Sequence, residues 1–296
     1  MSVSGMLRFG IRRPRKHLRT ALVYVLAIVV VVVVLAPIVW LIISSITPET
    51  QLLTVPLKWI PEHPSFDNYE AIITAAPKAD TTAGNFKVAV MNSLLIGSGV
   101  TVLCLLVGSL AAYAFARLDV PFGDKLIFVL LFTQMIPGIA IMLPLYLIAS
   151  RLGMLDRRLT LVVVYCSFSL PFVIWMMRGY FQTIPRELED AAMIDGCSRV
   201  GALFRVVMPL STPGLFATGI FAFLTAWNEF LLALVMTQSL NSKTMPVALA
   251  EFIGRFTVDY GLMCTVGVIA CIPPVLIALT FQRHLIEGLT AGAIKA

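Results

Sequence analysis

PRELEDAAMIDGCSRVGALFRVVMPL, residues 185–210, is a charged stretch in the second half of a very apolar chain. Pro185 suits the first turn of a helix, where its missing amide hydrogen is not needed. Gly196 suits the end of that helix, and Ser198 suits the cap of a second helix that runs to Met208. The stretch therefore predicts two short helices that are separated by a glycine bend.

The composition of the whole chain is that of a membrane protein. Of its 296 residues, 59% are hydrophobic and 13% are charged, whereas a soluble domain has about 25% charged residues. The five cysteines and three histidines show no spacing typical of a disulfide framework or a metal site. We therefore expect a polytopic membrane protein without a metal site.

Long apolar stretches predict the spans, because a helix needs about 20 residues to cross the hydrocarbon core. The first stretch is too long for a signal peptide, and SSITPET after it lacks a cleavage pattern, so it predicts a retained helix. A short helix over 67–73 is expected outside the bilayer. The six predicted spans are 21–45, 88–116, 126–150, 159–178, 210–235 and 261–281.

Proline and small residues predict local features of these spans. Pro137, Gly138 and Pro144 predict kinks or unwinding in the third span, and Pro171 predicts a break in the fourth. The pair Pro273 and Pro274 predicts a kink in the sixth. In the second span, small residues predict close helix packing, namely Gly97, Gly99, Gly108, Ser109, Ala111 and Ala112.

The distribution of positive charge predicts the orientation. Residues 1–19 are basic and contain no acid. With six spans, the loops on the same side of the membrane as residues 1–19 hold, together with them, more Lys and Arg than the loops on the other side. The excess places both termini and the 185–209 loop in the cytoplasm, although Arg157 and Arg158 oppose it. The basic terminus is interpreted as a topogenic flank rather than a nucleic-acid arm, and 20–296 as one transmembrane domain.

A family pattern matches the opening stretch. Asp190-Ala191-Ala192, then Gly196 six residues after Asp190, then Met208-Pro209-Leu210 resemble the "EAA" loop of ABC importer permeases. That pattern is E-A-A, three residues, G, about nine residues, then I-x-L-P. Asp190 stands where the family usually has glutamate, with Glu189 one residue earlier, and Met208 precedes Pro209 where leucine is usual.

Other motifs are similar to the carbohydrate importer branch, and in particular to the smaller permease subunit of maltose- and trehalose-type transporters. They are Asn92-Ser93, AAYAFAR at 111–117, AWNE at 226–229 and GLTAGA at 288–293. The resemblance implies an all-α, type I ABC importer permease with six spans in a prokaryotic cytoplasmic (inner) membrane. It implies a second permease subunit, two cytoplasmic ATPase subunits and an external sugar-binding protein as partners.

The resemblance also implies how the 185–209 loop acts. Its first helix, 185–195, is expected to lie in a cleft of one ATPase, with contact made by either Glu189 or Asp190. The chain has no G-x-x-x-x-G-K-[ST] phosphate loop. It is therefore expected to bind no cofactor and to catalyse no reaction, with ATP and Mg²⁺ in the partner subunits. The expected coupling residues are Glu189, Asp190, Ala191, Ala192, Asp195, Gly196 and Pro209.

Weaker signals mark the substrate path and the external face. Glu229 lies inside an apolar run, and an acid there usually faces a cavity or a polar partner. It is interpreted as a path or gate residue, a structural hydrogen-bonding group or an exposed side chain. Trp227 is interpreted as an interface anchor or a sugar-stacking surface, and Asn228 and Gln134 are polar path candidates. Residues 245–259, with Glu251 and Arg255, are expected to face the binding protein.

Rival functions lack their signatures. A membrane enzyme would need a cluster of His, Asp, Ser or Cys at membrane depth, and a channel or secondary transporter would need several buried charges or matching halves. The alternative that stays open is an ABC permease for a non-sugar substrate such as a polyol or glycerol phosphate.

Overall fold

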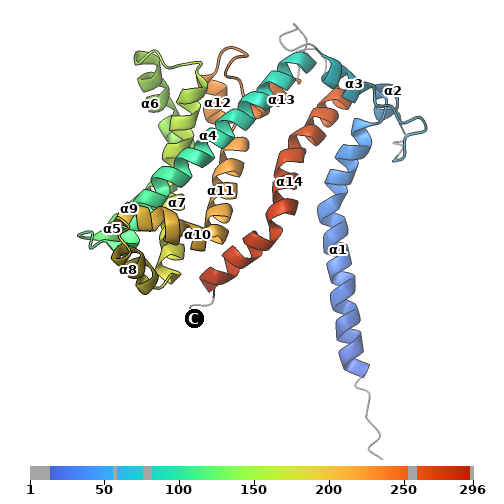
Figure 1. The fold of residues 1–296 in the computed structure, drawn as a ribbon. Coiled ribbons are helices and arrows are strands. Elements are labelled where there is room, and N and C mark those ends of the chain that lie inside the picture. Colours follow the sequence, from blue (N-terminus) through green and yellow to red (C-terminus); the bar gives the residue numbers. More distant parts are fainter. Residues whose placement is uncertain (1–13, 56–58, 76–81, 253–258, 294–296) are drawn as a thin grey trace, which may run out of the picture.

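The computed structural model describes residues 14–55, 59–75, 82–252 and 259–293, and every regular element in these ranges is a helix. Figure 1 shows long helices that run side by side, with short helices gathered at the two ends. The longer helices are α1 (Pro14–Ser45), α4 (Thr82–Arg117), α5 (Gly123–Phe132), α6 (Gly138–Arg151), α7 (Arg158–Thr183), α11 (Thr212–Trp227) and α14 (Tyr260–Ala293). The shorter ones are α2 (Glu49–Leu52), α3 (Asp67–Thr74), the 3₁₀ turn η1 (Thr133–Met135), α8 (Arg186–Ile194), α9 (Arg199–Ala202), the π-helical turn η2 (Leu203–Val207), α10 (Met208–Leu210), α12 (Leu231–Met236) and α13 (Met245–Ala250).

Helices α4, α7 and α11 form the centre of the bundle (Figure 1). Their facing side chains make one buried apolar cluster, which includes Val100, Cys104, Leu161, Val173 and Ala222. In lipid such a core is held by close packing rather than by exclusion of water. This packing fixes the position of the two ends of α7, and with them the segments attached there.

Small residues allow these helices to approach closely, as the sequence predicted. A methyl group built on Gly108 would lie 2.6 Å from a Val173 side-chain carbon. A methyl group built on Gly214 of α11 would lie 2.4 Å from the ring of Tyr180. Contacts this short do not occur between real atoms, so glycine is required at these crossings.

Helix α1 stands apart from this centre and packs on α14 (Figure 1). Its apolar window, within Arg19–Ser45, has none of its residues buried in the chain on its own. At its upper end, Thr265 of α14 donates a hydrogen bond of 3.1 Å to the Ser45 carbonyl. The predicted first span and the short helix at 67–73 are both present, the latter as α3.

Among the described residues, four helices are long and apolar enough to cross a membrane alone. There are up to six spans if α5–η1 with α6, and α9–α10 with α11, each count as one bent pair. The third predicted span is α5–η1 and α6, which meet at 92° where Ile136 and Pro137 interrupt the helix. The fifth predicted span, 210–235, is not one continuous helix. It consists of α11 and α12, which are separated by a break at residues 228–230. In front of it, α11 meets the preceding helical segment, Arg199–Leu210, at an angle of 86°.

The prolines of the spans differ in their effect on the helices that contain them. Pro137 marks the break in the third span, but α6 continues through Pro144. The break expected at Pro171 is wrong, because α7 runs unbroken from Arg158 to Thr183. Neighbouring helices that cover a proline site in a membrane bundle satisfy the freed backbone groups, and Pro171 is buried between such neighbours. Helix α14 includes Pro273 and Pro274 without interruption and changes direction along its length (Figure 1).

We expect Gly214→Ala to lower the stability of the bundle by about 1–3 kcal/mol, the usual cost of overpacking. The measurement is the melting temperature of the purified protein in detergent. The control is Gly179→Ala, since a methyl group at Gly179 of α7 meets nothing within 4 Å. Equal melting temperatures for the two variants would contradict the close approach of α11 to Tyr180.

Candidate functional site

The charged stretch at the lower end of the bundle folds as a helix, a glycine bend and a second helical segment. Helix α8 begins after Pro185 and ends at the C-cap residue Asp195. Gly196 follows with φ of +92°, a conformation that side chains other than glycine rarely adopt. The Ser198 hydroxyl accepts a hydrogen bond of 3.1 Å from the Gly201 amide and caps α9. The helix–bend–helix prediction is confirmed.

The second helix differs from the prediction in its interior. It is not a regular α-helix to Met208 but passes from α9 through the π-helical turn η2 into α10. Pro209 lies inside α10 and has no amide hydrogen to donate to the carbonyl four residues earlier, that of Arg205. The π-helical turn therefore lies directly before the proline-containing turn.

Glu189 points into the molecule and fixes α8 to the end of α4. Glu189 is only 5% exposed. One carboxylate oxygen accepts a hydrogen bond from the Tyr113 hydroxyl, and the other accepts one of 2.9 Å from Arg117 Nε. The same guanidinium donates to the Ile184 carbonyl over 2.8 Å, just before α8 begins. This buried ion pair occupies the carboxylate, which leaves Glu189 as a structural group in the chain on its own.

Asp190, unlike Glu189, is exposed. Both acids line a polar cavity of about 250 Å³, together with Asp119, Arg186 and Arg199. The acid that stands at the glutamate position of the family pattern is therefore the accessible one of the pair.

The outer face of α8 is apolar with acids around it. Leu188 is 46% exposed and Ile194 is 86% exposed, and Ala191 is exposed between them. Ala192 is half-buried under the helix. A methyl group built on Gly196 would meet nothing within 4 Å, so the space beside the bend is open. Such a face suits a groove on another protein, anchored by apolar side chains.

Glu229 lies at the break between α11 and α12 and caps α12. Its two carboxylate oxygens accept hydrogen bonds from the amides of Leu232, at 2.8 Å, and Ala233, at 3.0 Å. The first amides of a helix lack partners within it, and a carboxylate is favourable at that positive end. Of the roles considered for Glu229, the structural hydrogen-bonding role is therefore present.

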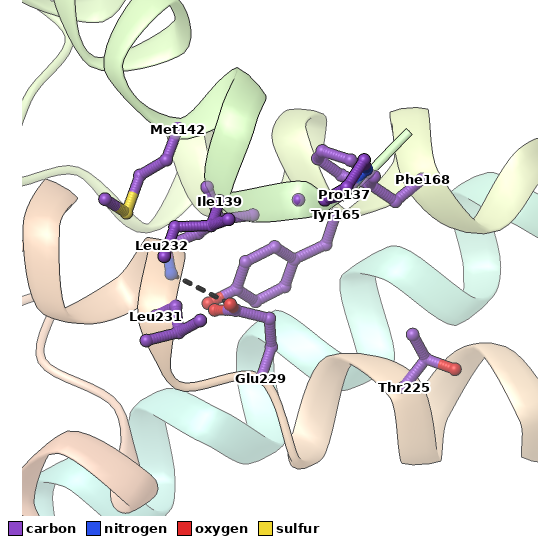
Figure 2. Close-up of a pocket in the computed structure, with 10 residues that line it drawn as sticks. Pro137, Ile139, Met142, Tyr165, Phe168, Thr225, Glu229, Leu231 and Leu232 are labelled. Carbon is purple, nitrogen blue, oxygen red and sulfur yellow. Dashed lines mark hydrogen bonds between the residues drawn. The ribbon is translucent and has the colours of Figure 1, made fainter. Parts of the chain in front are cut away.

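Glu229 also lines a pocket of about 500 Å³ between two helix breaks (Figure 2). Figure 2 shows the Tyr165 ring of α7 pointing toward its carboxylate, and the bond from Leu232 as a dashed line. The pocket lies where the α5–α6 break and the α11–α12 break face α7. The lining residues are mostly apolar: Pro137, Gly138, Ile139, Met142, Tyr165, Phe168, Thr225, Glu229, Leu231 and Leu232.

The other path candidates, Gln134, Asn228 and Trp227, are not among the residues that line this pocket. Gln134 is exposed and donates a hydrogen bond to the Phe168 carbonyl. Asn228 is exposed and donates to the Leu224 carbonyl over 2.9 Å. Both interpretations of Trp227, as an interface anchor and as a sugar-stacking surface, are wrong for this conformation. Trp227 is 1% exposed and stacks on Phe223, with 5.7 Å between the ring centroids. Its indole nitrogen donates to the Ala270 carbonyl over 3.3 Å.

The opposite end of the bundle carries the segment expected to face a binding protein. Glu251 is exposed and forms an ion pair of 2.5 Å with Lys243. Arg255 lies outside the described residues. Asp156 was not predicted as a site residue. It has φ of +59° and accepts hydrogen bonds from the segment after α12. Burial alone raises the pKa of the Asp156 carboxyl, but hydrogen bonds from Ser239, Ser242 and Gln238 outweigh it and hold the pKa well below its ordinary value.

Residues 104–290 match the family described as "Binding-protein-dependent transport system inner membrane component". The chain belongs to this family. As an inner membrane component it lies in the cytoplasmic membrane, which confirms the predicted location.

Named members of the family resemble the chain along nearly its whole length. It is 34% identical to the sulfoquinovosyl glycerol transport system permease protein SmoH of Agrobacterium fabrum, over 92% of this chain and 93% of the relative. It is 35% identical to the trehalose/maltose transport system permease protein MalG of Thermococcus litoralis, over 94% and 98%. It is 36% identical to the trehalose transport system permease protein SugB of Mycobacterium tuberculosis, over 92% and 96%. The resemblance to importer permeases is confirmed.

A solved structure shares the fold of this family member. It is the crystal structure of a bacterial ABC transporter involved in the import of the acidic polysaccharide alginate. One of its chains superposes with a TM-score of 0.77 at 20% identity, over 95% of this chain and 99% of that chain. The predicted all-α ABC permease fold is confirmed.

We expect Glu189→Ala to destabilise the family member by about 3 kcal/mol, because it leaves the buried Arg117 guanidinium without its ion-pair partner. The melting temperature in detergent should fall by several degrees. Asp190→Ala removes a neighbouring but exposed carboxylate, so it is the matched control and should keep the wild-type melting temperature. A larger fall for Asp190→Ala than for Glu189→Ala would show that the two carboxylates have been given the wrong roles.

Proposed function

We propose that this chain is the permease subunit of an ATP-driven, binding-protein-dependent importer of a carbohydrate, in which it forms half of the translocation pathway. The observation that carries the proposal is the outer face of α8, where Leu188 and Ile194 are exposed among acids while Glu189 fixes the helix to α4. The named relatives, which are permease proteins of trehalose, maltose and sulfoquinovosyl glycerol transport systems, support the substrate class.

The proposed topology has six spans, with α5–α6 and α11–α12 each counted as one interrupted span. Both termini and α8 lie in the cytoplasm, because the basic residues 1–19 and the arginines around α8 belong to the same side. The end with α12 and α13 then faces outward. Residues 1–19 form a basic cytoplasmic segment, and 20–296 form the transmembrane domain.

The proposed partners are a second homologous permease, two ATPase subunits and an external sugar-binding protein. Helix α8 lies in a cleft of one ATPase, with Leu188, Ala191 and Ile194 as apolar anchors and Asp190 as the accessible acid. ATP and Mg²⁺ bind those ATPase subunits, and this chain binds no cofactor and catalyses no reaction. A solved transporter structure described as containing a substrate-bound periplasmic protein shares the fold and supports the external partner.

Coupling follows from the two attachments of α8 to the bundle. Closure of the ATPases moves α8, and the Glu189–Arg117 ion pair carries that motion into α4. After the bend at Gly196, the chain continues through α9, η2 and α10 into α11. The same motion therefore reaches the pocket at the α11–α12 break. Rocking of packed helices around a fixed site gives alternating access. Glu229, Asn228 and Gln134 are the proposed path residues of this subunit, and Glu251 and Arg255 the proposed residues toward the binding protein.

The proposal is tested by assembling the complete transporter in lipid nanodiscs with its binding protein and a panel of ligands. We expect ATP hydrolysis to be stimulated several-fold by the binding protein with a mono-, di- or oligosaccharide. Polyol and glycerol phosphates belong in the panel, because stimulation by these compounds alone would replace the sugar by the non-sugar alternative. Failure of every ligand with a correctly assembled complex would refute an import function.

We expect Gly196→Val to reduce ATP-dependent uptake in proteoliposomes at least ten-fold, about 1.4 kcal/mol of lost coupling. A β-branched residue is strained at φ of +92° and also fills the open space beside α8. Gly196→Asn is the conservative control, since asparagine tolerates positive φ better than other residues. Wild-type uptake by Gly196→Val in an assembled complex would contradict a coupling role for the bend.

A further inference from the structure

The turn between α6 and α7 carries positive charge on the side where it is least expected. Arg151 ends α6, and Arg157 and Arg158 begin α7. In the proposed topology this turn is external, so these arginines oppose the rule that sets the orientation of the chain. The proposed function gives them no role.

This turn is tied firmly to the segment after α12. The Asp156 carboxylate accepts hydrogen bonds of 2.9 Å from the amides of both Gln238 and Ser239, and one from the Ser242 hydroxyl. The Asp156 amide donates to the Met236 carbonyl over 2.9 Å. Arg158 Nε donates to the Asn241 carbonyl over 2.7 Å. Backbone and side chain together therefore hold the two loops as one unit, which we call the Asp156 clasp.

Helix α4 holds the same segment from its other side. The Asn92 amide donates to the carbonyls of Leu240 and Lys243, each over 2.9 Å. The Ser93 hydroxyl accepts a hydrogen bond of 2.8 Å from the Met245 amide, where α13 begins. The external segment of residues 237–245 is thus fixed to two helices of the bundle rather than free to move as a loop.

The clasp presents positive charge that other described residues do not neutralise. Arg151 and Arg157 are exposed, and among the described residues neither forms an ion pair with an acid. Two acids at this end of the bundle have partners of their own, since Asp156 accepts the hydrogen bonds of the clasp and Glu251 pairs with Lys243. Exposed polar side chains, Gln238 and Asn241, continue the surface toward α13.

We propose that Arg151 and Arg157, held in place by the Asp156 clasp, form a docking surface for a carboxylate-bearing face of the external binding protein. The inference rests on the proposed function and names residues that meet its external partner. Fixed charges at the rim of an interface speed encounter and make it salt-dependent, and a rigid surface loses little freedom on binding. The surface is continuous with the segment at Met245–Ala250 that leads into the proposed binding-protein loop, which favours a protein over lipid headgroups as the occupant.

The test uses the complete transporter in nanodiscs and measures ATP hydrolysis against the concentration of sugar-loaded binding protein. For the double variant Arg151→Gln/Arg157→Gln, we expect the half-saturating concentration to rise about three- to ten-fold at low salt, as for two rim charges. The two curves should converge at high salt, where exposed charges are screened. Lys87→Gln is the matched control, because it removes an exposed external charge that lies outside the clasp and donates a hydrogen bond to the Ile73 carbonyl.

Asp156→Ala separates the clasp from simple charge, because it removes the carboxylate oxygen that accepts the hydrogen bonds from Gln238, Ser239 and Ser242. This change also removes a negative charge beside the arginines, so attraction alone predicts a lower half-saturating concentration. Loss of the clasp predicts an increase of about three-fold instead, because ordering the loop then opposes docking. A decrease would overturn the role of the clasp.

Each remaining outcome points to one conclusion. A wild-type transporter that no binding protein stimulates would refute the proposed function itself, whatever the arginines do. Normal stimulation with unchanged half-saturating concentration and salt dependence in the double variant would overturn the docking surface alone. An effect of the double variant that occurs with phosphatidylglycerol in the nanodisc and vanishes in phosphatidylcholine would assign the arginines to lipid headgroups and overturn the inference.

Discussion

The ion pair between Glu189 and Arg117 is the contact on which the working arrangement of this chain depends. It joins a charged, water-facing helix to the end of the long apolar helix α4 at 2.9 Å, and Tyr113 and the Ile184 carbonyl complete its hydrogen bonds. A buried pair of this kind is costly to break. Helix α8 is therefore held in one orientation, with its apolar and acidic face outward, without help from any other subunit.

A second constraint is that backbone groups within a bilayer need partners inside the protein. The helical path is interrupted between α5 and α6 and between α11 and α12, and each interruption leaves helix ends to be satisfied. At the α11–α12 break Glu229 meets this need with both carboxylate oxygens. An acid that would be costly as a free charge becomes part of the helix start, and the interruptions can border a pocket instead of collapsing.

The sequence predicted the elements whose signal is local and left open those that depend on neighbours. Pro185, Gly196 and Ser198 predicted the α8 segment because capping needs only a few adjacent residues. Pro171 predicted a break that is absent, since its effect depends on the helices packed around it. The burial of Glu189 beside the exposed Asp190 depends on Arg117, far away in the chain, and the clasp of Asp156 depends on a loop some eighty residues later. Such contacts have no signature in a single sequence.

The pairing of α1 with α14 has a consequence for how the chain is made. The hydrogen bond between Thr265 and Ser45 joins residues 220 positions apart, and α1 is otherwise open to its surroundings. Helix α1 therefore waits in the membrane until α14 is synthesised. During that interval its valine-rich surface faces lipid instead of its partner helix, so this pair forms only after the helices between the two have been made.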